Sequence, residues 1–207
     1  MRHLIVALLL ALLSTQSATE PKQEQRRADD LNLAAYNSSG GMAYWHSRKK
    51  GSDLDGTEVM VRRTNQPALR VSTKPIFKMK GVSKLILHGV DFTDAELSGI
   101  SEMSELPALL INGKITDDGL KHLDGLSKLK KLWIYRTHIT GTGIKHLKNI
   151  DSLEYLYIDT ELNDEGIEHL KRLTHLKQLW LPEFSDDKIR SLRKALPGTE
   201  ILTNRRR

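Results

Sequence analysis

The chain has 207 residues, no cysteine, and 32 lysine and arginine residues against 26 aspartate and glutamate residues, a net charge of +6. Without cysteine it has neither a disulfide framework nor a thiol for lipid attachment, so its own apolar core must hold it together. The basic excess is spread along the chain with both signs interspersed, which favours a solvated surface and argues against nucleic acid as a partner.

Residues 1–18 follow the order of regions that is typical of a secretory signal peptide. Arg2 and His3 give a basic start, residues 4–13 are apolar, and small or polar residues come next. This apolar run is shorter than the roughly 20 residues that a membrane-spanning helix needs. We therefore expect cleavage near residues 17–19 and a secreted or periplasmic bacterial protein that does not span a membrane. Retention of the segment as an uncleaved anchor is the alternative.

Residues 19–81 are expected to form a linker and an N-terminal cap. The segment begins with charged residues, and residues 28–36 have the composition of a short helix. Two strand-sized apolar runs follow, at 57–62 and 69–72. Such a cap covers the open edge of a repeat array.

Residues 82–201 contain an internal repeat with a period of about 23 to 24 residues. Within each copy the apolar spacing changes from two residues, typical of a strand, to the spacing of a helix. Stacked copies pair their strands in parallel and place their helices on the other side. The sequence thus predicts an α/β solenoid of about five strand-turn-helix repeats, with the parallel sheet on the concave face. The copies begin at Leu85, Leu109, Leu132, Leu156 and Leu179. A basic tail, residues 202–207, follows.

Polar residues mark the passage from strand to helix in every copy. Serine, threonine and asparagine are preferred at helix N-caps because their side-chain oxygens accept hydrogen bonds from free backbone N–H groups. The predicted N-caps are Thr93, Thr116, Thr140, Asn163 and Ser185. Four of them are followed by an aspartate, namely Asp94, Asp117, Asp164 and Asp186. A carboxylate in the first turn complements the helix dipole, so we interpret this column as structural and as neither catalytic nor calcium-binding.

The segment Ile115-Thr116-Asp117-Asp118-Gly119-Leu120-Lys121-His122-Leu123 resembles the short leucine-rich repeats of exported bacterial proteins. It is also similar to the cysteine-bearing leucine-rich repeats of F-box adaptor proteins. The resemblance extends over residues 82–201, and the outermost copies depart from it with Glu96 and Lys188 in the glycine column, as expected of capping repeats. It implies the leucine-rich-repeat fold and says almost nothing about a ligand.

A histidine recurs in three copies, at His122, His146 and His169. A zinc site needs ligand nitrogens that converge to about 2.0–2.1 Å from the metal, whereas neighbouring helices pack about 8–10 Å apart. We therefore expect these histidines to pack on the helix layer, and we predict neither a metal nor a cofactor. The sequence has no nucleophile elbow, phosphate-binding glycine loop or HExxH segment, so it does not predict an enzyme.

Alternation along the strands identifies a candidate binding surface. If Leu132 and Ile134 point into the core, Trp133 and Tyr135 point to the opposite, concave face. The residues aligned with Trp133 are Ile86, Leu110, Tyr157 and Trp180. This column is flanked on one side by Lys131, Tyr155 and Gln178, and on the other by His88, Asn112, Tyr135, Asp159 and Pro182.

An exposed aromatic stripe with a polar rim is typical of a binding hot spot. We therefore predict a monomer that binds a protein partner. The residues predicted to bind it are Trp133, Tyr135, Tyr155, Tyr157 and Trp180, with Lys131, Arg136 and Asp159 setting its register.

Three alternatives to a protein partner remain open. Envelope polysaccharide is one, because flat aromatic faces also pack on sugar rings. A ubiquitin-ligase adaptor role, by analogy with F-box proteins, ranks last because no F-box-like segment is visible. A purely structural explanation is that the rings stack on one another across strands about 4.7–4.9 Å apart, or that residues 20–81 cover them.

Overall fold

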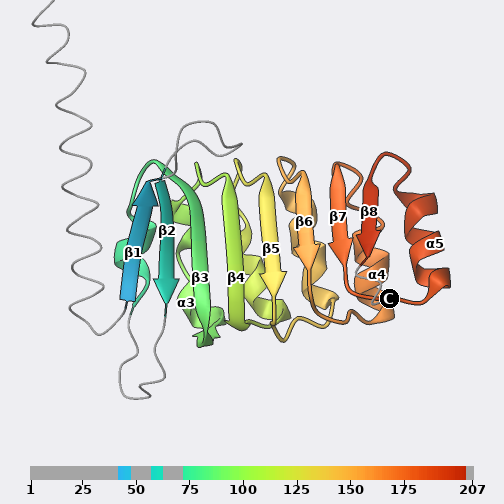
Figure 1. The fold of residues 1–207 in the computed structure, drawn as a ribbon, viewed down its shortest axis with the longest axis horizontal. Helices are drawn as coiled ribbons and strands as arrows, with labels where there is room; N and C mark the ends of the chain where they lie inside the picture. The colour runs from blue at the N-terminus through green and yellow to red at the C-terminus, as the bar shows by residue number, and fades with distance from the viewer. Residues whose placement is uncertain (1–41, 48–56, 63–71, 204–207) are drawn as a thin grey trace, which may run out of the picture.

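The computed structural model describes residues 42–47, 57–62 and 72–203 (Figure 1). The signal peptide predicted at residues 1–18, the helix predicted at 28–36 and most of the basic tail lie outside these ranges. The described residues form one open sheet with helical segments behind it (Figure 1). Within the described ranges, no helix combines the length and the apolar character needed to cross a membrane.

The sheet has eight strands whose spatial order is their order in the sequence. The first two strands are antiparallel to each other, and every later pair is parallel. The register places the predicted strand anchors opposite one another, as in Leu109 with Leu132 and Leu132 with Leu156. The strands are β1 (Met42–Ser47), β2 (Thr57–Arg62), β3 (Val82–Thr93), β4 (Ala108–Lys114), β5 (Lys131–Tyr135), β6 (Tyr155–Ile158), β7 (Gln178–Leu181) and β8 (Glu200–Thr203).

The sheet extends beyond the five strands predicted from the repeat. At one edge, the strand predicted at 57–62 is confirmed as β2, and β1 pairs with it. Of the strand-sized run at 69–72, the structure describes only Ser72, which is not part of a strand. At the opposite edge, β8 adds a strand that the repeat pattern did not predict, with Ile201 opposite Leu179.

Short helical segments connect the strands and cover one face of the sheet. The strand side chains on that face are aliphatic and almost completely buried, for example Leu109, Ile111, Leu132, Ile134 and Leu156. They form the core together with apolar residues of the helical segments. The segments are α2 (Lys74–Phe77), α3 (Asp94–Leu97), η1 (Ile100–Glu102), η2 (Asp117–Leu123), η3 (Thr142–Asn149), α4 (Asp164–Leu170) and α5 (Asp186–Ala195).

Three of these segments, η1, η2 and η3, are 3₁₀ helices, where the spacing predicted helices without distinguishing the type. Their surroundings are crowded, because neighbouring units approach backbone to backbone. An ideal Cβ on Gly143 would lie 2.4 Å from the Asp117 carbonyl oxygen, and one on Gly166 would lie 2.7 Å from the Gly141 Cα. The same close approach involves Gly166 of α4, which is an α-helix, so crowding alone does not select the 3₁₀ form.

Candidate functional site

The face of the sheet that points away from the helical segments carries one continuous row of apolar residues, which we call the outer column. Strand register joins each member to the next. The members in order are Met60, Ile86, Leu110, Trp133, Tyr157, Trp180 and Leu202. Ile86 is 6% exposed, Trp180 is 37% exposed, and the other members with described side chains are half-buried. Trp180 is therefore the most exposed member of the column.

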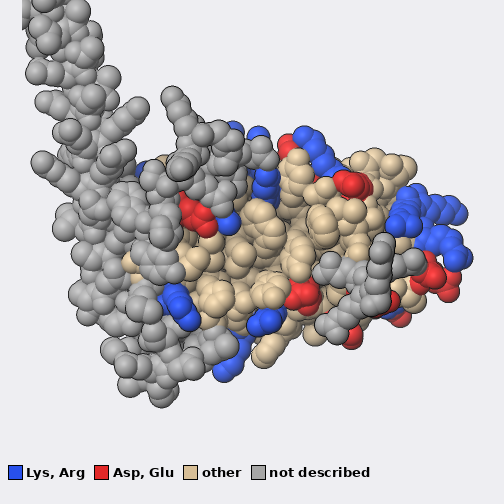
Figure 2. All heavy atoms as spheres, viewed as in Figure 1, with Lys and Arg blue, Asp and Glu red and all other residues tan. Residues whose placement is uncertain are grey.

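Five of the residues predicted to bind a partner lie together in a hollow on this face, the aromatic hollow. Its volume is about 260 Å³. The outward-pointing side chains that line it are Lys131, Trp133, Tyr155, Tyr157, Gln178 and Trp180, above the buried Leu132 and Leu156. Figure 2 shows the same side of the molecule as Figure 1, with uncharged surface along the sheet and charged groups mostly towards its margins.

The other three predicted residues do not line the hollow. Tyr135 is the last residue of β5, Arg136 follows it, and Asp159 follows the end of β6. They lie farther along the strands than Trp133 and Tyr157, which places them beside the hollow at one end of it.

Cations lie against several rings of this face. The Lys84 ammonium nitrogen lies 5.5 Å from the centroid of the Trp133 ring, and that of Lys131 lies 4.9 Å from the Tyr155 centroid. Beside the hollow, the Arg136 guanidinium carbon lies 5.1 Å from the Tyr135 centroid. Such contacts contribute about 0.5–1 kcal/mol each at exposed sites. Lys84 is also ion-paired with Glu58, with 3.3 Å between Nζ and Oε1, so Lys131 is the basic residue in the lining of the hollow.

Stacking of the rings on one another is limited. Among the described residues, the paired rings are those of Tyr135 and Tyr157, with centroids 6.3 Å apart and planes tilted by 32°. The structural explanation from the sequence was a row of rings stacked across the strands. In the described part of the chain, one tilted ring contact is present instead. Self-stacking does not account for Trp133 or Trp180.

The aspartate column joins neighbouring units. The Asp94 carboxylate accepts hydrogen bonds from the Thr116 backbone N–H and hydroxyl group. The Asp117 carboxylate accepts from the Thr140 backbone N–H and hydroxyl at 3.1 and 2.6 Å, and from the backbone N–H groups of Gly141 and Gly143 at 3.0 and 2.8 Å. Each carboxylate therefore holds the start of the next helical segment.

These hydrogen bonds affect the pKa of Asp117 and explain why Thr140 is not an N-cap. Burial raises the pKa of the Asp117 carboxyl, but the hydrogen bonds from Thr140, Gly143 and Gly141 outweigh burial, and the pKa is lowered from 3.8. The N-cap predicted at Thr140 is wrong, because η3 is capped at Gly141. The Thr140 hydroxyl donates to Asp117 of the preceding unit instead of accepting from its own helix. The N-cap positions at Thr93, Thr116, Asn163 and Ser185 are confirmed. The Thr116 and Asn163 side chains accept capping hydrogen bonds, whereas the Ser185 side chain makes none.

The three histidines of the predicted column are half-buried on the helix layer, and two of them contact carboxylates. His146 Nδ1 lies 3.9 Å from Asp124 Oδ2, and His169 Nε2 lies 3.5 Å from Glu165 Oε1. Within the described ranges, no group of three or more histidine, aspartate or glutamate side chains could hold a metal ion. A further histidine, His175, was not singled out from the sequence; burial lowers its pKa, and the charge of Asp151 opposes this shift.

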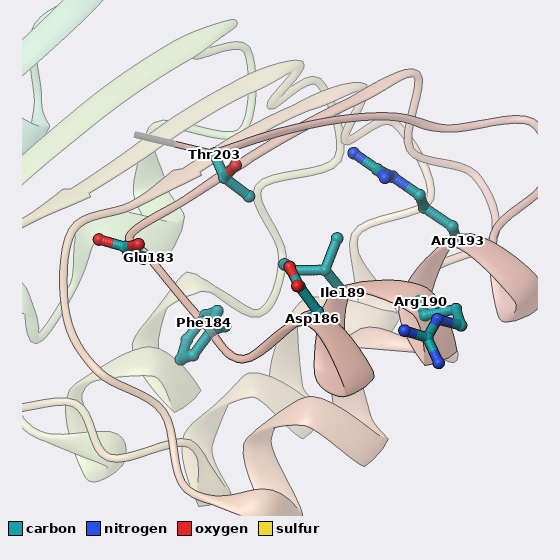
Figure 3. Close-up of a pocket in the computed structure, with 7 residues that line it drawn as sticks. All are labelled: Glu183, Phe184, Asp186, Ile189, Arg190, Arg193 and Thr203. Carbon is teal, nitrogen blue, oxygen red and sulfur yellow. The ribbon is translucent and has the colours of Figure 1, made fainter. Parts of the chain in front are cut away.

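A second hollow of about 610 Å³ lies at the C-terminal end of the sheet (Figure 3). Its lining combines acidic, basic and apolar side chains, and sequence analysis did not identify it. The lining residues are Glu183, Phe184, Asp186, Ile189, Arg190, Arg193 and Thr203. The Arg190 guanidinium is paired with Asp187 at 3.3 Å. The mixed charges do not define a ligand.

Comparison of the chain with protein-family models and with curated protein sequences found no match.

Proposed function

We propose that this chain is an exported leucine-rich-repeat protein that binds a protein partner on the outer face of its sheet. Export follows from the signal peptide predicted at residues 1–18. The repeat period, the parallel register and the placement of all helical segments on one side support a solenoid. In a solenoid of this kind the outer face of the sheet is concave, and concave faces are common docking surfaces.

The observation that carries this proposal is the aromatic hollow. Trp133, Tyr155, Tyr157 and Trp180 line one depression, and the fold buries none of them completely. Tyrosine, tryptophan and arginine are the residues enriched at binding hot spots. In the proposed complex these rings take the apolar part of the partner, with Tyr135 at the margin. Lys131, Arg136 and Asp159 fix the partner's register through charge.

Envelope polysaccharide is the second candidate ligand for the same hollow. Flat, partly exposed rings pack against the C–H faces of sugar rings. Gln178 and Lys131 lie among these rings and supply polar groups for hydroxyl or carboxylate substituents. A protein partner ranks first because the outer column continues beyond the hollow onto β8, which suits an extended protein surface.

The test is capture on the immobilised mature chain from a cell-envelope extract, followed by chemical cross-linking and mass spectrometry. We expect wild type to retain a protein that the W133A/W180A double variant loses. The control is K145A, an exposed change in η3 on the helix side, which retains it.

Two results would contradict the proposal. One is a saturable change of tryptophan fluorescence on titration with soluble envelope polysaccharide, absent in W180A, with no protein captured. The other is a large fall in the thermal midpoint of W133A/W180A without any lost ligand, which would assign the rings a structural role. We expect the midpoint to change little for Trp180, because folding leaves 37% of it exposed.

A further inference from the structure

The helical segments carry opposite charges at their two ends. The first turns of η2, α4 and α5 each hold two carboxylates, whereas the last turns and the residues directly after them are basic. Because the strands from β2 onwards are parallel, the segments that connect them all run the same way. Their first turns therefore lie along one edge of the helix layer and their last turns along the other. This second edge, the basic edge, is formed by Lys121, Lys148, Lys171, Arg172, Arg193 and Lys194.

Contacts between neighbouring units place these ends side by side. Asn149 is the last residue of η3, and its Nδ2 donates to Oδ1 of Asp124, the residue that follows η2, at 3.3 Å. Farther along the same edge, Lys177 Nζ lies 3.0 Å from Glu154 Oε2, and these two residues directly precede β7 and β6. The cations of the basic edge thus form a row that crosses the units instead of separate clusters.

The fold uses the acidic edge and the basic edge differently. At the acidic edge, Asp117 holds the start of the next segment by four hydrogen bonds, and Asp164 Oδ1 lies 2.8 Å from Lys188 Nζ of the next unit. At the basic edge, Lys148 and Arg172 are exposed, and neither forms an ion pair in the structure. A cation in a last turn complements the helix dipole, but like charges on neighbouring units repel one another. An anion lying across several units would relieve this repulsion.

We propose that the basic edge binds an acidic polysaccharide whose chain runs across the units. A surface of one charge sign attracts a polyanion, and a row from η2 to α5 matches a linear polymer with an anionic group on each sugar better than a compact anion. A membrane surface fits less well, because the large apolar side chain that the described ranges leave exposed, Trp180, lies on the opposite face and offers no insertion at this edge. The inference shares only the expected export with the proposed function.

The test measures binding of the mature chain to fluorescently labelled polygalacturonate, a linear polymer with a carboxylate on each sugar, by fluorescence anisotropy. The variant K148E/R172E reverses two exposed charges of the basic edge and should weaken binding by about tenfold or more. The matched control K74E/K78E changes the net charge by the same amount at exposed residues of α2 and just after it. It should weaken binding by less than about twofold, because distant charges are screened. Equal losses in the two variants would overturn the basic edge as a site.

Two further variants separate charge from fold. K148R/R172K keeps both charges and should bind like wild type, whereas K148Q/R172Q removes them without reversing them and should bind with an affinity between those of wild type and K148E/R172E. The thermal midpoint of each variant shows whether it is folded at the temperature of the measurement. Raising the salt from about 0.05 to about 0.5 M should abolish binding to the polymer. Binding that K148Q/R172Q and high salt leave unchanged would overturn the proposal.

Competition experiments identify the kind of ligand and the face that binds it. Unlabelled polygalacturonate should displace the labelled polymer, whereas galacturonate monomer and neutral dextran should not. Displacement by the monomer as effective as by the polymer would refute a site that extends across the units. Tighter binding to phosphatidylglycerol vesicles than to the polymer, lost in K148E/R172E, would replace the polysaccharide by a membrane. W133A/W180A should bind the polymer like wild type, and K148E/R172E should still capture the protein partner. Loss of polymer binding in W133A/W180A would place the polymer in the aromatic hollow and overturn the proposal.

Discussion

The two faces of the sheet are built from the same strands and differ in what folding does with them. On the helix side, Leu132 and Leu156 are 1% exposed. On the outer face, their chain neighbours Trp133 and Tyr157 are only half-buried, and Trp180 is 37% exposed. Full burial of a leucine side chain contributes about 1.5–3 kcal/mol. The helix side therefore carries the stability of the fold, and the outer face retains apolar area that folding leaves unused. Changes on the two faces should separate stability from binding.

The largest effect is expected on the helix side, at Gly143. A Cβ there would lie 2.4 Å from the Asp117 carbonyl oxygen and 2.7 Å from its Cα. Because the obstacle is backbone, the units must move apart, and we expect Gly143→Ala to lower the free energy of unfolding by about 3 kcal/mol. Urea unfolding measures it.

The matched control for Gly143 is Gly198, where an added Cβ meets nothing within 4 Å. We expect Gly198→Ala to change the free energy of unfolding by no more than about 0.5 kcal/mol. Equal stability of the two variants would contradict the close approach of neighbouring units.

The next effect is expected at Asp117, whose carboxylate accepts four hydrogen bonds from the following unit. Asp117→Asn keeps the shape and removes the charged acceptor, which should cost about 2 kcal/mol at neutral pH. The same change at Asp164 should cost less, because that exposed carboxylate contacts Lys188 at the surface.

The contribution of Asp117 should depend on pH in a defined direction. Its pKa is lowered in the folded chain below the ordinary 3.8, so the unfolded chain binds the proton more readily. The stabilisation is then complete above that ordinary value and is lost as the pH falls through the folded pKa. Wild type and Asp117→Asn should differ most in urea unfolding at neutral pH and converge below pH 3.8. A constant difference from pH 7 to pH 3 would show that the charge of Asp117 is not responsible.

The fold could be predicted to the extent that the units repeat. Leu85, Leu109 and Leu132 occupy one column, and the register pairs them as aligned. The strand β8 was not predicted because the repeat pattern ends with the copy that begins at Leu179. The pairing of β1 with β2 was not predicted because neither strand carries the repeat. The 3₁₀ form of η2 and η3 was not predicted, because the apolar spacing indicates a helix without distinguishing its type.

The candidate site was predictable where it depends on alternation alone. Period-two spacing was enough to place Lys131, Trp133 and Tyr157 on the outer face. The spacing could not show that Tyr135, Arg136 and Asp159 lie outside the hollow. Alternation indicates which face of the sheet a residue occupies, but it does not indicate how far along the strand a hollow extends. The hydrogen bond that Gln178 Nε2 donates to Glu200 Oε2 could not be predicted, because it depends on the register between β7 and β8.

The smallest effect on stability is expected on the outer face, at Arg136. Its φ of 48° lies in the left-handed region, which costs a non-glycine residue about 1–2 kcal/mol and glycine very little. Its guanidinium lies against Tyr135, a contact that contributes about 0.5–1 kcal/mol.

In Arg136→Gly the strain and the ring contact are lost together, so the free energy of unfolding should change by less than about 1 kcal/mol. In Arg136→Ala the strain remains and only the contact is lost, so this variant should be the less stable of the two by about 1 kcal/mol in urea unfolding. Both should capture the partner more weakly than wild type if Arg136 sets its register. Unchanged capture by both variants would confine the binding role of this face to the aromatic hollow. If Arg136→Gly were instead less stable than Arg136→Ala, Arg136 would support the fold as the helix-side residues do.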